Sequence, residues 1–513
     1  MRRKCPRPSA RPGAKKETEA ELLPGPEETS LTERGYGIPK ARLTPATVEA
    51  LKKELTMTPI VAAGAPSTQG PTVSFPVFME SSSKLYVPRC FGLKRFGPPD
   101  RRTLAEGEQL STGVAFTGRL RTEQLEPIAA FIAAARDPMR MGGILSLPCG
   151  FGKTVAALHV IAALGKRTLI IVHKDFLLNQ WRERVREFLP GASLGTVKAQ
   201  TVDVAGKDVV IASLQSLSMK DYDPDVLSGF GLLIVDECHR VGTEVFIRAL
   251  HKVGFGHALG LSATVDRKDG MTKAFVHFLG DVLFKGKRRS DAVDVVQHPF
   301  SSADLEYCKE ETVYGGNPNV SRMINNICEF EPRNRLIVDT IAGLIAAEPG
   351  RRVLVLSDRK SQLKVIKAGV EAAGLTAGFY WGGMKPADLA VSETKQVMCA
   401  TFPYAAEGMD VPGLDTLVLA SPKSDIEQSC GRILRQKADA RERTPLIFDV
   451  ADDFSLFGRQ AAKRRAFFKK HAYTLYGSVA AREAGGLPSD PSDSDGEGEG
   501  EGGKAFAFTD LDE

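Results

Sequence analysis

The chain has 513 residues, 42% of them hydrophobic and 26% charged, with a formal net charge of +5. These proportions are those of an ordinary globular protein, and the length favours about three domains. No run of about 18 apolar residues occurs, because Lys166 and Arg167 interrupt the longest candidate, which argues against a membrane span. The basic amino terminus has no apolar segment behind it, which argues against a secretory signal.

The cysteines are scattered along the chain without any close pair. This spacing argues against a structural zinc site and against a disulfide framework. We therefore expect reduced thiols in an intracellular, non-secreted protein. The eight cysteines are Cys5, Cys90, Cys149, Cys238, Cys308, Cys328, Cys399 and Cys430.

Charge is unevenly distributed between the two ends of the chain. Residues 1–16 carry seven Lys or Arg and no acid, whereas residues 484–513 carry nine Asp or Glu and only one Lys. A basic body with an acidic tail is typical of a protein that binds a polyanion and competes for that site with its own tail. The alternative is that both ends are solubilising disorder.

The acidic end has two compositional parts. Residues 489–503 are a low-complexity mixture of Asp, Ser, Gly and Glu that does not fold alone. Phe506, Phe508 and Leu511 then follow in an acidic setting, a pattern also compatible with a docking peptide for a protein partner.

Residues 147–154 form a glycine-rich loop of the kind that cradles phosphates. Gly150 and Gly152 let the backbone curl, so that successive amide N–H groups face a polyphosphate at a helix N-terminus. Lys153 adds a charge for the β- and γ-phosphates, and the Thr154 hydroxyl can ligate Mg²⁺. The loop departs from the strict motif because a leucine stands where the first glycine belongs. Its residues are Leu147, Pro148, Cys149, Gly150, Phe151, Gly152, Lys153 and Thr154.

An acidic pair completes the nucleotide site. Residues 232–235 are an apolar run, typical of a buried parallel strand, and Asp236 and Glu237 follow at its carboxyl end. We expect Asp236 to hold Mg²⁺, and Glu237 to orient or deprotonate the attacking water. Together with the phosphate loop, the pair predicts ATP and Mg²⁺ as cofactors.

The pattern of apolar runs predicts an α/β fold: two parallel-sheet domains in tandem, preceded by a small α+β accessory domain. The expected organisation is a basic tail over 1–34, an accessory, nucleic-acid-binding domain over 35–115, an ATP-binding domain over 116–285, a connector over 286–330, a second domain over 331–476 and an acidic tail over 477–513. Expected strands are 143–147, 168–172, 209–212, 232–235 and 258–261 in the first large domain, and 353–357, 378–380, 396–401, 416–420 and 446–448 in the second.

Further polar residues recur at strand ends and on one helix. A carboxamide such as that of Gln124 can pair with adenine. The hydroxyls of Ser262-Ala263-Thr264 stand where they could relay nucleotide state to His239. In the second domain, arginines three apart on a helix favour an arginine finger that acts when a cleft closes, although a lone Arg pair is more often a solvated helix face. The residues of that domain are Thr401, Glu407, Gly408, Met409, Asp410, Gln428, Gly431, Arg432 and Arg435.

In this order, these motifs resemble those of superfamily two helicases and translocases. Within them the chain resembles the XPB/Rad25-like branch, and most closely the poxvirus-type transcript-release helicases of large DNA viruses. The supporting strings are SLQSLSMKDY (213–222), GLSATVDRKDG (260–270), WGGMK (381–385), LASPKSDIEQSCGRILRQ (419–436) and DDFSLFGRQAAKRR (452–465). The resemblance spans roughly residues 36–476.

The resemblance implies two RecA-like domains that clamp ATP, with nucleic acid across both. It assigns adenine recognition to Gln124, phosphate and metal to Lys153, Thr154 and Asp236, and the attacking water to Glu237. It assigns the finger motif to Gln428, Arg432 and Arg435, nucleotide contact to Gly408 and Asp410, and the phosphodiester backbone to Ser213, Gln215 and Thr401. One departure is Lys268, where XPB-type proteins often carry Glu, so an XPB-like role of that element is in doubt.

From the resemblance we expect ATP-dependent movement on or unwinding of DNA, in the 3′-to-5′ direction, in viral transcription (transcript release), replication or repair. The expected polymer is single-stranded or duplex DNA, with an RNA–DNA hybrid as a further candidate. A viral source would place the protein in the virion or in the host cytoplasm or nucleus. Two alternatives remain open: an RNA helicase, and a non-catalytic nucleic-acid-binding scaffold. Two basic runs could extend the grip on phosphates: Lys285, Lys287, Arg288 and Arg289, and Lys463, Arg464, Arg465, Lys469 and Lys470, the second interleaved with Phe467 and Phe468.

Overall fold

The computed structural model divides the chain into two compact units, Met1–Arg288 and Arg289–Glu513. The residues that it describes are 22–60, 74–148, 150–241, 244–263, 265, 270–286, 292–313, 316–409, 411, 413–434, 436 and 441–484. Both predicted tails therefore lie largely outside the described residues. Within the described part, no helix is long and apolar enough to cross a membrane.

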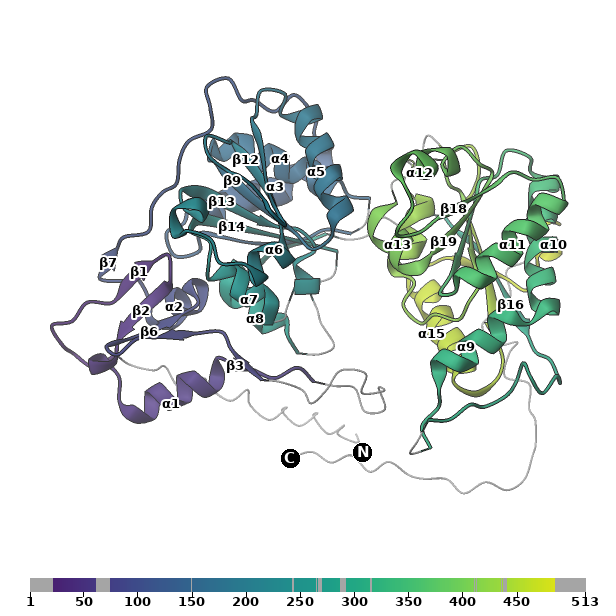
Figure 1. Cartoon of the computed structure of the whole chain (residues 1–513), viewed down its shortest axis with the longest axis horizontal. Helices are drawn as coiled ribbons and strands as arrows, with labels where there is room; N and C mark the ends of the chain where they lie inside the picture. Colours follow the sequence, from purple (N-terminus) through teal and green to yellow (C-terminus); the bar gives the residue numbers. More distant parts are fainter. Residues whose placement is uncertain are drawn as a thin grey trace, which may run out of the picture. The chain divides into compact units, whose positions relative to one another are not determined.

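The first unit is built on an eight-stranded sheet in the order β11-β10-β12-β9-β13-β14-β8-β15 (Figure 1). All neighbours pair in parallel except β11, which runs antiparallel to β10. Every position of β8, β9, β12 and β13 is buried, because crossover helices cover both faces of the sheet. The strands are β8 (Gly142–Ser146), β9 (Thr168–Val172), β10 (Leu194–Lys198), β11 (Thr201–Asp203), β12 (Val209–Ser213), β13 (Phe230–Val235), β14 (Phe255–Ser262) and β15 (Val282–Lys285).

Alternate residues of β13 pack into two different hydrophobic cores, one on each face of the sheet. Leu232 and Ile234 pack in the cluster with α3 (Thr122–Arg136), α4 (Lys153–Leu164) and α5 (Asp175–Phe188). Leu233 and Val235 pack in the cluster on the opposite face. That face carries α6 (Leu214–Met219), η2 (Pro224–Leu227), η3 (Cys238–Val241), α7 (Glu244–Leu250) and α8 (Thr272–Leu279).

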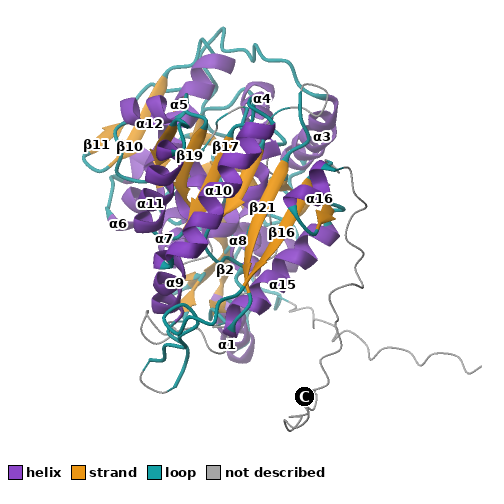
Figure 2. Ribbon diagram, turned by 90° about the vertical axis from the view of Figure 1, so that its right-hand side faces the viewer, coloured by secondary structure: helices purple, strands orange, loops and turns teal. Residues whose placement is uncertain are grey.

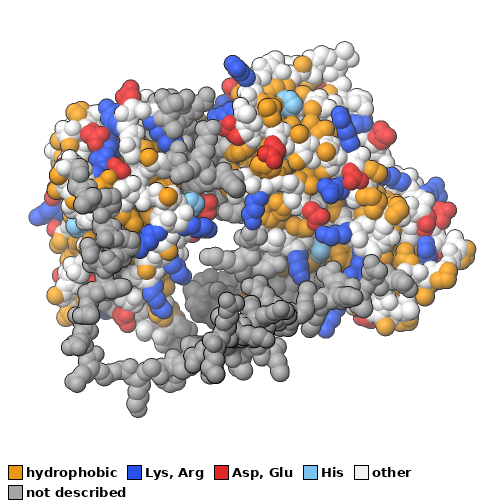
Figure 3. Space-filling model, turned by 180° about the vertical axis from the view of Figure 1, so that it is seen from behind, with side chains coloured by type: hydrophobic (Ala, Val, Ile, Leu, Met, Phe, Trp, Pro, Cys, Tyr) orange, Lys and Arg blue, Asp and Glu red, His pale blue; other side chains and the backbone are white. Residues whose placement is uncertain are grey.

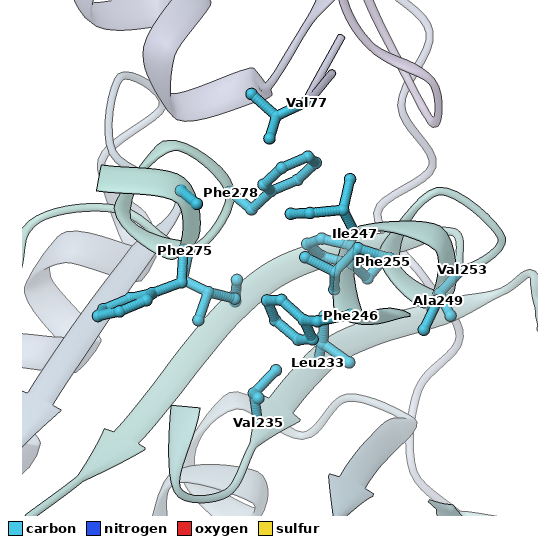
Figure 4. Close-up of a cluster of buried hydrophobic side chains, with 14 of the residues drawn as sticks. Val77, Leu233, Val235, Phe246, Ile247, Ala249, Val253, Phe255, Phe275 and Phe278 are labelled. Atoms are coloured by element: carbon cyan, nitrogen blue, oxygen red, sulfur yellow. The ribbon is translucent and has the colours of Figure 1, made fainter. Parts of the chain in front are cut away.

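The accessory region has a five-stranded sheet in the order β5-β6-β2-β1-β7. Its core is continuous with the cluster on the face of the large sheet that carries α7 and α8. Figure 4 shows Val77 close to Phe278, beside Ile247 and Phe255. The buried Arg89 donates to the carbonyls of Phe255 (2.8 Å) and Gly256 (3.0 Å), which ties the region to β14. Its elements are β1 (Ser30–Thr32), β2 (Gly35–Pro39), η1 (Lys40–Arg42), α1 (Pro45–Glu54), β3 (Thr56–Met57), β4 (Phe75–Pro76), β5 (Met79–Glu80), β6 (Lys84–Val87), α2 (Arg89–Phe96) and β7 (Arg101–Arg102).

The second unit has a seven-stranded sheet, β18-β19-β17-β20-β21-β16-β22, in which every neighbouring pair is parallel. Figure 2 shows α10 and α11 covering one face of these strands. The strands are β16 (Asp294–Phe300), β17 (Val353–Ser357), β18 (Ala377–Tyr380), β19 (Val397–Thr401), β20 (Thr416–Leu419), β21 (Leu446–Asp452) and β22 (Thr474–Tyr476). The helices are α9 (Val320–Glu329), α10 (Glu331–Ala347), α11 (Lys360–Ala372), α12 (Pro386–Ser392), α13 (Phe402–Gly408), α14 (Glu427–Cys430), η4 (Gly431–Leu434), α15 (Ser455–Lys470) and α16 (Val479–Glu483).

The expected connector over 286–330 is wrong for much of its length, since it contains β16 and α9. Strand β16 lies between β21 and β22, inside the sheet. Its polar residues hid it from the apolar pattern, but they have partners in the fold. The Gln297 amide donates to Asp449 Oδ2 (2.9 Å) and to the carbonyl of Ala461 (3.1 Å).

The predicted α/β class is confirmed, with two parallel-sheet units in tandem and a small N-terminal α+β region. Each of the ten expected strands of the large domains overlaps a strand of the structure, and 168–172 and 353–357 match β9 and β17 at both ends.

Candidate active site

The phosphate loop joins β8 to α4 at the carboxyl edge of the first sheet. Gly150 (φ +79°) and Gly152 (φ +87°) both have left-handed backbone conformations, which glycine adopts without strain. Lys153 is the first residue of α4, so its side chain lies at the same end of the helix as the first backbone N–H groups, which have no acceptor within the helix itself. The Lys153 ammonium donates to the carbonyl of Leu147 at 3.4 Å.

The acidic pair lies at the same edge, directly after β13. Asp236 is buried, and Glu237 has a positive φ of 48°, a strained conformation for a residue with a side chain. The Lys153 ammonium lies 3.3 Å from Glu237 Oε1, with exposed side-chain fractions of 14% and 21%. The fold therefore brings the loop and the acidic pair together, although they are about 80 residues apart in sequence.

The environment of Asp236 is unfavourable for a charge. Burial raises the pKa of its carboxyl to about 6, and the negative charge of Glu237 acts in the same direction. The indole N–H of Trp181 donates to Asp236 Oδ2 (2.9 Å) and opposes the rise. A cation at this carboxylate would relieve the same penalty, so the site is chemically suited to a divalent ion.

His239 links the acidic pair to the end of β14. Its Nδ1 lies 2.9 Å from the Ser262 hydroxyl and 3.3 Å from Glu237 Oε2. His239 and Ser262, which we expected to relay the state of the nucleotide, are therefore in contact. Ala263 follows Ser262, and Thr264 lies outside the described residues.

Gln124 is buried on α3 and braces the phosphate loop. Its amide donates to the carbonyls of Phe151 (3.1 Å) and Gly152 (3.2 Å), and its oxygen accepts from the backbone N–H of Arg121 (2.8 Å). A Cβ at position 152 would lie 2.5 Å from the Gln124 nitrogen, so the glycine is required for this close approach. Both amide hydrogens are engaged by the loop rather than directed at a base.

The residues of the loop and the acidic pair fit a nucleotide and Mg²⁺. Among the described residues other than Gly150 and its chain neighbours, no heavy atom lies within 4 Å of where a Cβ of Gly150 would stand, so the curled backbone leaves open space just before α4. Pro148, Phe151 and half-buried Thr154 belong to the described part of this loop, whereas Cys149 lies outside it. Thr154 and Asp236 would hold the cation, and Lys153 the phosphates.

The residues expected at the phosphodiester backbone also follow strands. Ser213 ends β12 and is buried, and Gln215 is exposed in the first turn of α6. In the second unit Thr401 ends β19 and precedes α13. The contact of these residues with the backbone of a nucleic acid stays a prediction.

The expected arginine finger has a local structure that differs from one regular helix. Gln428 lies on the short helix α14, and Gly431 and Arg432 lie on the 3₁₀ helix η4. Arg432 is buried and donates to the carbonyl of Met409 (2.7 Å). Gly408 ends α13, while Asp410 and Arg435 lie outside the described residues.

The second basic run lies on α15, and the expectation that all of its basic residues bind phosphates is wrong for Arg464. Arg464 is buried, and its Nε donates to Asp449 Oδ2 at 2.9 Å, so it is not available to a phosphate. Phe468 is buried in the core and Phe467 packs against the same cluster, which favours the packing interpretation of both rings. Lys463, Lys469 and Lys470 are exposed. In Figure 3, Lys and Arg side chains of the visible face are interspersed with Asp, Glu and apolar side chains.

Sequence reasoning missed Trp181. The residue lies on α5, and its partner Asp236 follows β13, so the contact depends on tertiary packing. The available signal was a Trp on an amphipathic helix that follows the strand next to the acidic pair, but this pattern alone predicts only a core residue.

Comparisons with known proteins agree with this geometry. Residues 117–267 match the family model described as "Type III restriction enzyme, res subunit", a range that contains the loop and the acidic pair. A protein of Acanthamoeba polyphaga mimivirus, whose name proposes an ATP-dependent RNA helicase, is 30% identical over 455 residues, covering 87% of this chain and 86% of its own.

Two further relatives are viral. A protein of Invertebrate iridescent virus 6, named for a helicase, is 26% identical over 352 residues, covering 64% of this chain and 76% of its own. A protein of African swine fever virus, whose name also proposes an ATP-dependent RNA helicase, is 25% identical over 369 residues, covering 65% and 69%. With 30% identity to the mimivirus protein over most of both chains, and with the phosphate loop and acidic pair in one site, the chain belongs to the superfamily two helicases.

Proposed function

We propose that this helicase is a nucleic-acid-dependent ATPase that moves along or unwinds DNA in the 3′-to-5′ direction. The observation that carries the ATPase part is the meeting of Lys153 with Glu237 at the carboxyl edge of one sheet. In that arrangement a phosphate chain would draw the Lys153 ammonium towards itself, which releases the Glu237 carboxylate to act on a water.

The roles of the first-unit residues follow from their chemistry. Mg²⁺, held by Thr154 and Asp236, would neutralise charge that develops on the phosphates. Glu237 orients the attacking water and accepts its proton. His239 contacts both Glu237 and Ser262, so it can transmit the protonation or rotation of the Glu237 carboxylate to the end of β14. Gln124 keeps the loop in the curled conformation.

The second unit would complete the site. In the proposal, Arg432 and Arg435 supply positive charge to the γ-phosphate when the two units close, with Gln428, Gly408 and Asp410 near the nucleotide. For Arg432 this requires exchange of its bond to the Met409 carbonyl. Ser213 and Thr401, at the ends of β12 and β19, and Gln215, in the first turn of α6, would bind the phosphodiester backbone.

The polymer and the biological setting are further parts of the proposal. Resemblance to the XPB/Rad25-like and poxvirus-type proteins supports DNA and a role in viral transcription, including transcript release. The names of the mimivirus and African swine fever virus relatives instead favour RNA, so RNA is the second candidate substrate. The acidic tail and its proposed docking peptide lie outside the described residues.

Steady-state ATP hydrolysis tests the proposal. The full chain is assayed without polymer and with single-stranded DNA, duplex DNA or single-stranded RNA. Lys153→Ala serves as the blank, and Lys53→Ala, an exposed lysine on α1, as the matched control. Stimulation by DNA supports the proposal, stimulation by RNA alone moves the substrate to RNA, and turnover that persists in Lys153→Ala contradicts the site.

A further inference from the structure

Trp181 is a fully buried side chain whose polar end reaches the acidic pair. It is 2% exposed and lies on α5 among Leu178, Val185 and residues of the phosphate-loop helix α4. Its Nε1 lies 2.9 Å from Asp236 Oδ2. The ring therefore spans from a hydrophobic core to a carboxylate at the edge of the sheet.

The chemistry of the two groups makes this contact directional. An indole has one N–H and no acceptor, so a buried Trp needs one acceptor in a defined place. Asp236 accepts one N–H on each oxygen: Trp181 on Oδ2 and the backbone N–H of Glu237 on Oδ1, at 3.0 Å. Two donors from different segments fix the plane of the carboxylate, and a further lone pair of each oxygen remains for other ligands.

The position of α5 explains why this donor can be rigid. The helix follows β9, which is the sheet neighbour of β13, and it packs beside α4 in the same cluster. The same hydrophobic core thus packs against α4, which follows the phosphate loop, and through Trp181 it also holds Asp236 in place. A bulky ring in a close-packed core has few alternative rotamers.

We propose that Trp181 is a positioning residue that holds Asp236 in the orientation needed to bind the divalent cation of a nucleotide complex. The inference rests on the proposed ATPase function and adds a residue that neither the motifs nor the comparisons assign. Outer donors that orient a ligand commonly change metal affinity by 10-fold or more when they are removed.

The test measures cation-dependent nucleotide binding, so it does not depend on turnover. Binding of a fluorescent ADP analogue to the full chain is titrated with Mg²⁺ and compared with binding in EDTA. Trp181→Phe keeps an aromatic ring in the core but removes the N–H. Trp381→Phe, which changes the other tryptophan of the chain, is the matched control.

The expected result is a rise of about 10-fold or more in the Mg²⁺ concentration for half-maximal binding in Trp181→Phe, with binding in EDTA unchanged. In an Asp236→Asn background the same substitution should add no further change, because the oriented carboxylate is already lost. A merely structural role would change binding in EDTA as well, and to the same extent in both backgrounds. A parental Mg²⁺ dependence in Trp181→Phe would overturn the proposal.

A second measurement covers the case in which Trp181→Phe does not fold. In the Trp381→Phe chain, labelled with ¹⁵N-tryptophan, a single indole N–H resonance remains. Addition of Mg²⁺ with ADP should shift it, whereas ADP in EDTA should not; an unmoved resonance would overturn the proposal. Failure of the ATPase proposal itself is distinct, because the parental chain would then show no Mg²⁺-dependent binding of the nucleotide.

Discussion

Arg333 on α10 and Asp452 at the end of β21 form a fully buried, two-pronged ion pair. The Arg333 Nε lies 2.7 Å from Asp452 Oδ1 and its Nη2 lies 2.9 Å from Oδ2, and both side chains are 0% exposed. The Tyr307 hydroxyl donates to the same carboxylate at 2.8 Å. The pair therefore fixes α10 and the segment around Tyr307 to the sheet of the second unit.

Arg333→Met should strongly destabilise the second unit. Removing one partner leaves the Asp452 charge buried without its counter-ion, which costs about 3–5 kcal/mol. Urea unfolding followed by the fluorescence of Trp381, in a Trp181→Phe background, reports on this unit. The matched control is Arg335→Met, whose ion pair with Glu331 is exposed and is worth less than about 1 kcal/mol. Equal effects of the two changes would contradict the assignment.

Gln124→Ala tests whether Gln124 stabilises the phosphate loop or recognises adenine. The carbonyls of Phe151 and Gly152 would lose their donor, which at about 1 kcal/mol for each bond should raise the KM for nucleotide roughly 5- to 30-fold. If Gln124 only stabilises the loop, the KM should rise by the same factor for ATP and for GTP in hydrolysis assays. A larger loss for ATP would instead show that Gln124 recognises the base.

Two half-buried histidines should make the first unit sensitive to acid. Burial lowers the pKa of His251 to about 4, where its ring meets Phe278 edge-on, and also lowers the pKa of His277, beside Phe91, to about 4. Unfolded histidine titrates near 6.5, so the unfolded chain binds these protons first. The stability that the neutral rings allow is present above about pH 6.5 and is lost as the pH falls towards 4.

The slope of that loss is measurable. Each ring should contribute up to about 1.4 kcal/mol per pH unit within the window. Urea unfolding of the full chain between pH 4 and 7.5, followed by Trp181 fluorescence in a Trp381→Phe background, measures it. A His251→Phe/His277→Phe double variant should flatten the slope, and an unchanged slope would contradict the prediction.

Helix α15 should contribute phosphate contacts through its exposed lysines. The helix contains no acid, and Lys463, Lys469 and Lys470 are exposed. Lys463→Ala/Lys470→Ala should weaken binding to nucleic acid, and each lost contact should reduce the salt dependence of log K by about 0.7–0.9. Fluorescence anisotropy over a range of salt concentrations measures both effects, with Lys53→Ala as the control. An unchanged salt dependence would exclude this surface from the binding track.

The success of sequence reasoning follows the degree of burial. Strands such as β9, Thr-Leu-Ile-Ile-Val, were predictable to the residue because a parallel strand covered on both faces is a continuous apolar run. Strand β16 was missed because its polar residues find partners, such as Asp449, only in the folded sheet. The same holds for Arg464, which resembles its exposed neighbour Lys463 in sequence but is buried and paired with Asp449 in the fold.

The candidate site divides in the same way. The loop and acidic pair have local signatures, and the parallel fold brings them to one edge. The bonds of Gln124 to the loop and of Trp181 to Asp236 cross between elements, so no local pattern encodes them. The bond of Arg432 to the Met409 carbonyl is likewise a tertiary contact, invisible in a motif that is identified by spacing.

The most direct test of the central claim compares nucleotide binding and hydrolysis in Glu237→Gln. The account predicts that ATP affinity is retained, since Lys153 and the loop are intact, while the nucleic-acid-stimulated kcat falls by about 100-fold or more with the loss of the general base. Glu244→Gln, which changes a nearby partly exposed carboxylate on α7, should behave like the parent. Turnover of Glu237→Gln at the parental rate would contradict the assignment of the site.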